Sequence, residues 1–138
     1  MKRVIKFREE PDNINDSTDM FKKIKSIEID YGQENMIIFF LNSRNSLIDY
    51  EIMFKGGLNA TIIDPRIIFR RAIEHNSNSI IVAHNHPSGI CKPSTEDRSI
   101  FKRLKKAGDL INCYVLDSII FTESSFYSMG GESEKNGI

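Results

Sequence analysis

Two histidines separated by one residue, with an aspartate further along the chain, are the residues of this sequence best suited to chemistry. They are His84, His86 and Asp97. In an extended backbone, residues i and i+2 point to the same side, so both imidazoles can face one point. The glycine- and proline-containing loop that follows can fold the aspartate back toward them. Two histidines and one carboxylate leave a fourth tetrahedral position open, as in catalytic rather than structural zinc sites.

Each half of this pattern also has an ordinary explanation. Histidines one residue apart are common without any metal, and Ser94-x-x-Asp97 is typical of a helix N-cap with an acidic residue at N3. Asp97 cannot be only a surface cap if it binds zinc. Cys91 could approach the metal as a fourth ligand and close the site, but an incidental loop cysteine is the simpler interpretation.

The complete spacing changes this balance, because His-x-His-Pro followed by Ser-x-x-Asp resembles the motif of the JAMM metallohydrolases. The resemblance extends over roughly Asp30 to Met129 and narrows to the RadC-like branch of that group. The similar blocks are, in order, Gly56-Gly57-Leu58-Asn59, Pro65-Arg66, His84-Asn85-His86-Pro87-Ser88-Gly89, Pro93-Ser94, Glu96-Asp97 and Leu116-Asp117. The resemblance implies Zn²⁺ as the cofactor, held by the two histidines and the aspartate.

The same resemblance implies roles for two further side chains. JAMM proteins use an upstream glutamate on the metal-bound water, and the matching residue is Glu34, which would act as general base. Read without the resemblance, it is a charged residue at a strand entrance. Ser94 matches the motif serine and would stabilise the developing oxyanion. If its hydroxyl instead caps the helix, its role is structural. Asn85 and Ser88 are interpreted as loop-shaping residues.

The function implied is a zinc metallopeptidase or isopeptidase that hydrolyses an amide bond of a peptide or protein substrate. One alternative is a DNA-repair or mobile-element accessory protein that binds DNA or a protein partner without peptidase activity. A basic cluster on a later predicted helix, Lys102, Arg103, Lys105 and Lys106, suits it, although a solvated helix face explains such clusters equally. Another is a domain that zinc only stiffens for protein interaction. Zinc deaminases are excluded because their His-x-Glu and Pro-Cys-x-x-Cys signatures are missing.

Ser118 stands where RadC-like chains usually have a histidine. If that histidine contacts a metal ligand or the substrate, the same contact is in doubt in this chain.

Composition bounds the remaining choices. The 138 residues fit one domain, and 19 basic and 19 acidic side chains give zero net charge. Nucleic-acid binding is therefore not supported by charge, because duplex binders usually carry a basic excess. There are two cysteines and no CxxC pair, and the longest apolar run, Met36 to Leu41, is far shorter than the ~20 residues that cross a bilayer. We expect a cytoplasmic protein with reduced thiols and no membrane partner; its oligomeric state stays open.

The elements that must position these residues follow from hydrophobic periodicity and capping signals. Helices are predicted from Asp16 or Ser17, from Asp64-Pro65 to about His75, and from Ser94 to about Ala107 with Gly108 as the stop. Strands are predicted at 4–7, 36–41, 47–54, 79–83, 114–116, 119–122 and 126–129, with a loop over 84–93. This order indicates an α/β fold with a mixed sheet covered by helices. The resemblance implies a JAB/MPN-like, cytidine-deaminase-like layered architecture. We divide the chain into a polar segment 1–16, a catalytic domain 17–129 and a flexible tail 130–138.

Overall fold

The computed structural model describes residues 13–59, 61–131 and 133–136. The strand predicted at residues 4–7 lies outside these ranges. The helices and strands are α1 (Ser17–Lys25), β1 (Asn35–Leu41), β2 (Leu47–Lys55), α2 (Pro65–Glu74), β3 (Ser79–Asn85), α3 (Thr95–Ile111), β4 (Tyr114–Phe121), β5 (Ser125–Ser128) and β6 (Ser133–Asn136).

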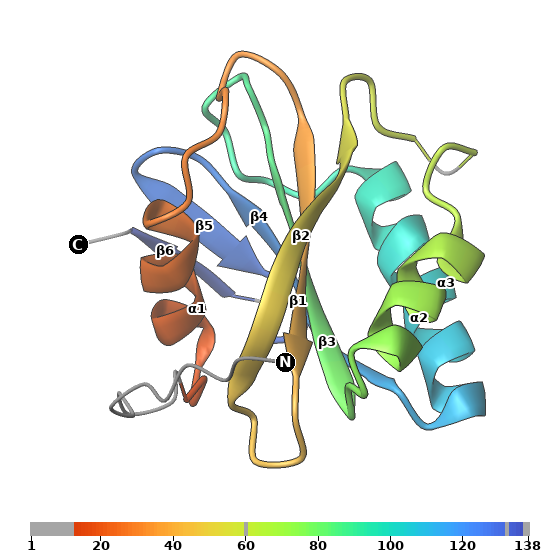
Figure 1. The fold of residues 1–138 in the computed structure, drawn as a ribbon. Coiled ribbons are helices and arrows are strands. Elements are labelled where there is room, and N and C mark those ends of the chain that lie inside the picture. Colours follow the sequence, from red (N-terminus) through yellow and green to blue (C-terminus); the bar gives the residue numbers. More distant parts are fainter. Residues whose placement is uncertain (1–12, 60, 132, 137–138) are drawn as a thin grey trace, which may run out of the picture.

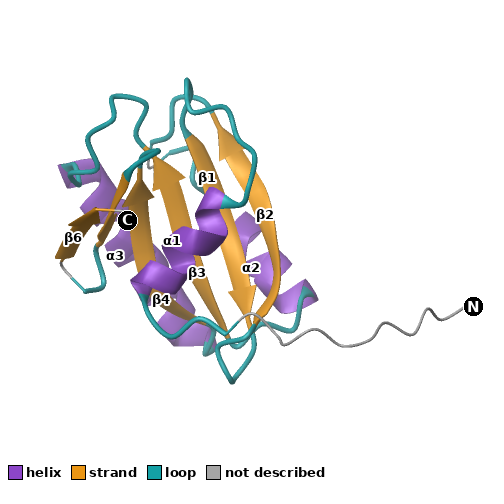
Figure 2. Ribbon diagram, turned by 90° about the vertical axis from the view of Figure 1, so that its left-hand side faces the viewer, coloured by secondary structure: helices purple, strands orange, loops and turns teal. Residues whose placement is uncertain are grey.

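The strands form one sheet in the order β2-β1-β3-β4-β5-β6. Only the β3–β4 pair is parallel among these neighbours, and α3 makes the crossover between its two strands. Helix α1 covers one face of the sheet, and α2 and α3 cover the other (Figures 1 and 2). The predicted α/β class, a mixed sheet covered by helices, is confirmed.

Strand β1 shows why this layered structure forms. All its residues are buried. Its side chains alternate between two cores: Ile37, Phe39 and Leu41 pack with α1, whereas Met36, Ile38 and Phe40 pack with α2 and α3. A strand covered on both faces reads as a continuous apolar run. The Met36–Leu41 run therefore predicted a buried strand correctly.

The helix starts follow local capping chemistry. Asp16 caps α1 by accepting from the Asp19 amide, and Asp64 caps α2 by accepting from the Arg66 amide, with Pro65 in the first turn. A capping side chain satisfies an amide that has no partner within the helix. These starts agree with the sequence-based expectation.

The predicted end of α3 at Ala107 was wrong. The helix continues through Gly108 to Ile111, and Asn112 terminates it in a left-handed conformation with φ of 57°. Gly108 serves packing instead, because a Cβ there would lie 2.3 Å from the Cys113 carbonyl oxygen.

Two further stretches differ from the predictions. Strand β3 continues through His84 and Asn85, which were assigned to a loop, because both residues pair with Ile120 and Phe121 of β4. In the stretch predicted to be a flexible tail, residues 133–136 form β6 by antiparallel pairing with β5. Pairing of backbone groups needs no apolar side-chain pattern, so the polar sequence gave no signal for it.

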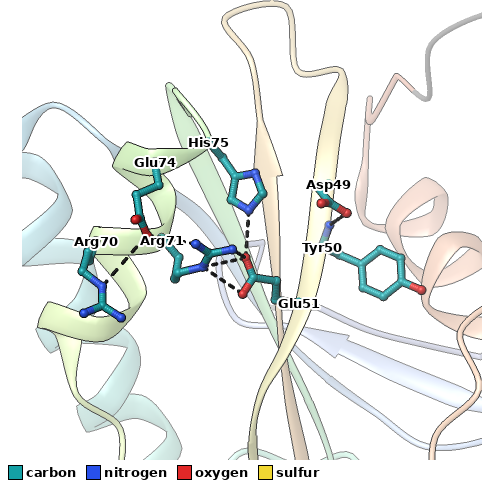
Figure 3. Close-up of polar contacts among 7 residues, drawn as sticks. All are labelled: Asp49, Tyr50, Glu51, Arg70, Arg71, Glu74 and His75. Atoms are coloured by element: carbon teal, nitrogen blue, oxygen red, sulfur yellow. Dashed lines mark hydrogen bonds and ion pairs between the residues drawn. The ribbon is translucent and has the colours of Figure 1, made fainter. Parts of the chain in front are cut away.

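A cluster of charged side chains fastens α2 to the edge strand β2 (Figure 3). Glu51 of β2 receives the Arg71 guanidinium at 2.8 Å and lies 2.8 Å from His75 Nε2. The His75 ring stacks on Phe40 of β1, with ring centroids 4.3 Å apart. His75 is therefore largely covered, although it lies at the end of a helix.

Within the described ranges, no helix has both the length and the apolar character needed to span a membrane.

Candidate metal centre

The site lies where three elements meet at one end of the sheet, uppermost in Figures 1 and 2. Strand β3 ends there with His84 and Asn85, and α3 begins there after the loop that carries His86. Strand β1 runs antiparallel to β3 and places Met36 opposite His84. The residue just before β1, Glu34, is therefore brought to the same end of the sheet.

The three predicted ligands converge. The candidate donor atoms of His84, His86 and Asp97 all lie within 4.8 Å of one another. His84 Nε2 is 3.0 Å from Asp97 Oδ1, and His86 Nε2 is 3.1 Å from Asp97 Oδ2. His84 and Asp97 are buried, and His86 is half-buried. The carboxylate thus bridges two imidazoles from its two oxygens.

The second ring nitrogen of His86 determines which atom faces the carboxylate. Its Nδ1 lies 2.9 Å from the Ile90 carbonyl oxygen, which can only accept a hydrogen bond, so Nδ1 carries the proton. In the neutral ring, Nε2 then presents a lone pair toward an ionised Asp97. Two lone pairs at this distance repel each other unless a proton or a metal ion lies between them. The arrangement therefore calls for a proton or a metal ion at this point.

Electrostatics lead to the same conclusion. Burial would raise the pKa of Asp97, but the hydrogen bonds with His84 and His86 overcome it and hold the pKa well below its usual range. The pKa of His86 is raised, chiefly by its hydrogen bond with Asp97 and also by the charge of Glu34. The carboxylate is ionised at neutral pH and attracts positive charge.

The donor set and its spacing fit zinc. Two bonds of about 2.1 Å at a tetrahedral angle place ligand atoms about 3.4 Å apart, slightly further than the 3.0 and 3.1 Å contacts seen here. Metal-binding histidines also usually donate their other ring N–H to an acceptor, as His86 does to Ile90. Among the described residues, His84 Nδ1 is buried without such a partner. Three protein donors leave room for a fourth ligand.

Asp97 and Ser94 serve two purposes at once. Ser94 Oγ accepts from the Asp97 amide at 3.0 Å, and the Ser94 amide donates to Asp97 Oδ2 at 2.8 Å, which makes a capping box at the start of α3. The cap therefore orients the carboxylate that faces the histidines. Ser94 Oγ is an acceptor in this bond, so its own hydrogen is not used by it. The predicted oxyanion role of Ser94 stays a prediction.

Glu34 is held from the β2 side. Its carboxylate oxygen Oε1 accepts from the Leu58 amide at 3.2 Å, and its carbonyl accepts from the Gly56 amide at 2.9 Å. The Gly56–Asn59 block of the sequence pattern therefore contacts the predicted general base directly. Its role as general base also stays a prediction.

Other singled-out residues lie outside the donor cluster. Cys91 is buried, and Ser125 Oγ donates to its sulfur at 3.5 Å. Ser88 Oγ accepts from the Ile90 amide at 3.3 Å, which agrees with a loop-shaping role. Ser118 is buried in β4 opposite Val82.

The structure adds a cavity that the sequence did not indicate. A space of about 140 Å³ beside His86 is lined by Tyr31, Pro87, Gly89 and residues 122–124. The lining comes from three distant segments with no shared spacing, so only the fold brings them together. Burial, together with the charge of Glu123, raises the pKa of Tyr31.

This layered fold and this donor set define a JAMM-related domain with a candidate metal site. The model of the RadC-like JAB domain family matches residues 14–136, and the chain belongs to this family. The resemblance seen in the sequence is confirmed.

Relatives in several bacteria support this assignment. UPF0758 protein SH1266 of Staphylococcus haemolyticus is 44% identical over 110 residues, which cover 80% of this chain and 46% of that protein. A UPF0758 protein of Flavobacterium johnsoniae is 36% identical over 119 residues, covering 86% of this chain and 52% of that protein. The chain therefore matches only about half the length of these relatives.

Proposed function

We propose that this chain is a zinc-dependent hydrolase that cleaves an amide bond, in a peptide or an isopeptide linkage. The observation that carries the proposal is the convergence of His84, His86 and Asp97, with the proton on His86 Nδ1 leaving Nε2 directed at Asp97. Family membership supports it, because JAB domains are related to the JAMM metallohydrolases.

Each residue has its own role in the proposed reaction. His84, His86 and Asp97 would hold Zn²⁺, which would supply Lewis-acid chemistry and make water a stronger nucleophile. Glu34 takes the proton from the attacking water and returns it to the leaving nitrogen, as a general base and then a general acid. Ser94 donates its hydroxyl hydrogen to the carbonyl oxygen as negative charge develops there. The cavity beside His86 receives a substrate side chain.

Metal content of the purified protein tests the ligand set. We expect about one zinc per chain, as three protein donors and an open position predict, and its loss in His86→Ala and Asp97→Ala. His75→Ala is the matched control, because the third histidine of the chain contacts Glu51 and not this cluster. No zinc in wild-type protein, even after zinc is added back, would contradict the proposal.

Glu34→Gln tests the chemistry separately from the metal. This variant should keep zinc and the Leu58 contact, because the amide oxygen still accepts, but it cannot take up a proton. Hydrolysis of a substrate found by peptide-library screening should fall by 10²-fold or more, about the usual contribution of a general base. Equal activity of Glu34→Gln and wild type would exclude the mechanism.

A further inference from the structure

Asn85 stands between the two predicted histidine ligands, and its side chain is fully buried. Successive side chains of a strand point to opposite faces, so Asn85 points away from His84. It faces the loop that leads into β1. The sequence suggested only that this residue shapes its own loop.

The Asn85 side chain forms hydrogen bonds with the residues immediately before and after Glu34. Asn85 Oδ1 accepts from the Asn35 amide at 2.8 Å and from Asn35 Nδ2 at 3.1 Å. Asn85 Nδ2 donates to the Gln33 carbonyl at 2.9 Å. The residues immediately before and after Glu34 are thus both bound to one side chain. The orientation of the Asn85 amide is fixed, because its oxygen must face the Asn35 N–H donors and its nitrogen the Gln33 carbonyl.

The partner residue makes this contact rigid. Asn35 is also buried, and its Nδ2 donates to the carbonyls of Asp30 and Gln33 at 2.9 and 3.0 Å. The loop before β1 is therefore tied to the end of β3 by a closed group of buried hydrogen bonds. Such groups are costly to disrupt because the freed donors and acceptors cannot reach water.

We propose that Asn85 is a positioning residue. It holds Glu34 at a fixed position relative to His84 and His86, the candidate ligands that flank Asn85 in the chain. The proposal rests on the proposed function, in which Glu34 acts next to the metal. Its physical reason is that a general base must be placed within a fraction of an ångström of its working position. One amide side chain offers both the acceptor and the donor needed to hold residues 33 and 35.

The experiment uses Co²⁺ as the metal probe and needs no substrate. The 138-residue chain is labelled with ¹³C-glutamate and loaded with Co²⁺, and the metal-induced pseudocontact shift of the Glu34 carboxyl carbon is measured by NMR. This shift depends on the position of the carboxyl group relative to the ion, which a merely stabilising residue would leave unchanged. Co²⁺ affinity is measured in parallel by competition with a chelator.

Three variants are compared. Asn85→Ala removes the three hydrogen bonds between the Asn85 side chain and residues 33 and 35. Asn85→Asp is the second variant in case the first does not fold: it keeps the size and the oxygen facing Asn35, and replaces the donor to Gln33 with a repelling oxygen. Asn42→Ala is the matched control, because Asn42 Oδ1 likewise accepts two amides, from Arg44 at 2.9 Å and Ser46 at 3.0 Å, at the far end of β1.

We expect all variants to bind Co²⁺ with affinity within about threefold of wild type, and the Glu34 shift in Asn85→Ala to fall at least about twofold, because the released carboxyl group moves off its fixed position. Asn85→Asp should change the shift in the same direction, and Asn42→Ala should leave it unchanged. An unchanged Glu34 shift in both Asn85 variants, or an equal change in Asn42→Ala, would overturn the inference while leaving the proposed function intact. Loss of Co²⁺ from a folded Asn85 variant would also overturn it, since Asn85 would then act on the ligands. Failure of the wild type to bind Co²⁺ would overturn both proposals.

Discussion

A glycine inside a helix ordinarily costs about 1 kcal/mol of stability relative to alanine. Gly108 in α3 is an exception, because the fold leaves no room for a side chain at this position. A Cβ at this position would lie 2.3 Å from the Cys113 carbonyl oxygen and 3.3 Å from the Phe69 ring and from Val115. The missing methyl group lets the last turns of α3 pack directly on the start of β4, and Asn112 ends the helix one turn later than the glycine suggests.

We therefore expect Gly108→Ala to lower the free energy of unfolding by about 2 kcal/mol, because the overpacking outweighs the gain in helix propensity. Urea denaturation followed by circular dichroism measures this difference. Gly57→Ala is the control, since a Cβ there meets no atom within 4 Å, and it should change stability by less than about 0.5 kcal/mol. A more stable Gly108→Ala protein would show that the close approach to Cys113 is absent.

At the scale of elements, an ion pair between Arg71 and Glu51 attaches α2 to the sheet edge, in addition to the apolar packing of the helix on the sheet. Both Glu51 oxygens lie 3.0 Å from Arg71 Nε, and Arg71 also contacts Glu74 at 2.9 Å (Figure 3). The Arg71 hydrogen bond lowers the pKa of Glu51, with a smaller opposing effect of burial. Arg70, one residue earlier, lies 4.0 Å from Glu74 and is largely exposed.

Arg71→Ala should therefore lower the free energy of unfolding modestly, because its partly exposed pair is screened by solvent, whereas Arg70→Ala should lower it by less. The contribution of a carboxyl with a lowered pKa is present above its ordinary value, 4.5 for Glu51, and is lost as the pH falls through the lowered value. The Arg71→Ala difference should thus be constant near neutral pH and shrink in acid. Urea titrations at a series of pH values measure it, and a difference that grows in acid would refute the assignment to Glu51.

Local signals in the sequence were sufficient for most elements, and together with the family resemblance they grouped the three candidate ligands. Asp16, Asp64 and Ser94 marked the helix starts correctly, because capping depends on residues two or three apart. His84, His86 and Asp97 could likewise be grouped because they lie within one strand, one loop and one helical turn.

Features that depend on distant packing could not be predicted in this way. Asn85 and Asn35 are separated by 50 positions, and no periodicity links them until β1 pairs with β3. The packing of Gly108 against Cys113 and the pairing of β6 depend on the same long-range assembly. The local sequence at these positions indicates a turn, a helix end or a tail. Long-range packing and strand pairing determine a different structure.

At the scale of the whole molecule, the candidate site joins the end of β3 to the start of α3. An ion that binds the folded chain but not the unfolded chain would stabilise the whole fold, by ~2.7 kcal/mol when its free concentration is a hundred times Kd. For a chain of this size we expect zinc to raise Tm by roughly 8 °C relative to chelator-treated protein. Differential scanning calorimetry measures the shift. Asp97→Ala should show none, and an equal shift in that variant would place the stabilising ion elsewhere.

The pairing of Met36 with His84 has a practical consequence for anyone purifying this protein. The three candidate ligands belong to one short piece of chain, residues 84–97, whereas Glu34 is placed by the pairing of β1 with β3. Under the proposed function, metal binding and the placement of the general base therefore depend on different contacts. A preparation with a full complement of metal would still be inactive if Glu34 were misplaced, so the fraction of competent molecules is better counted at Glu34 than by the metal.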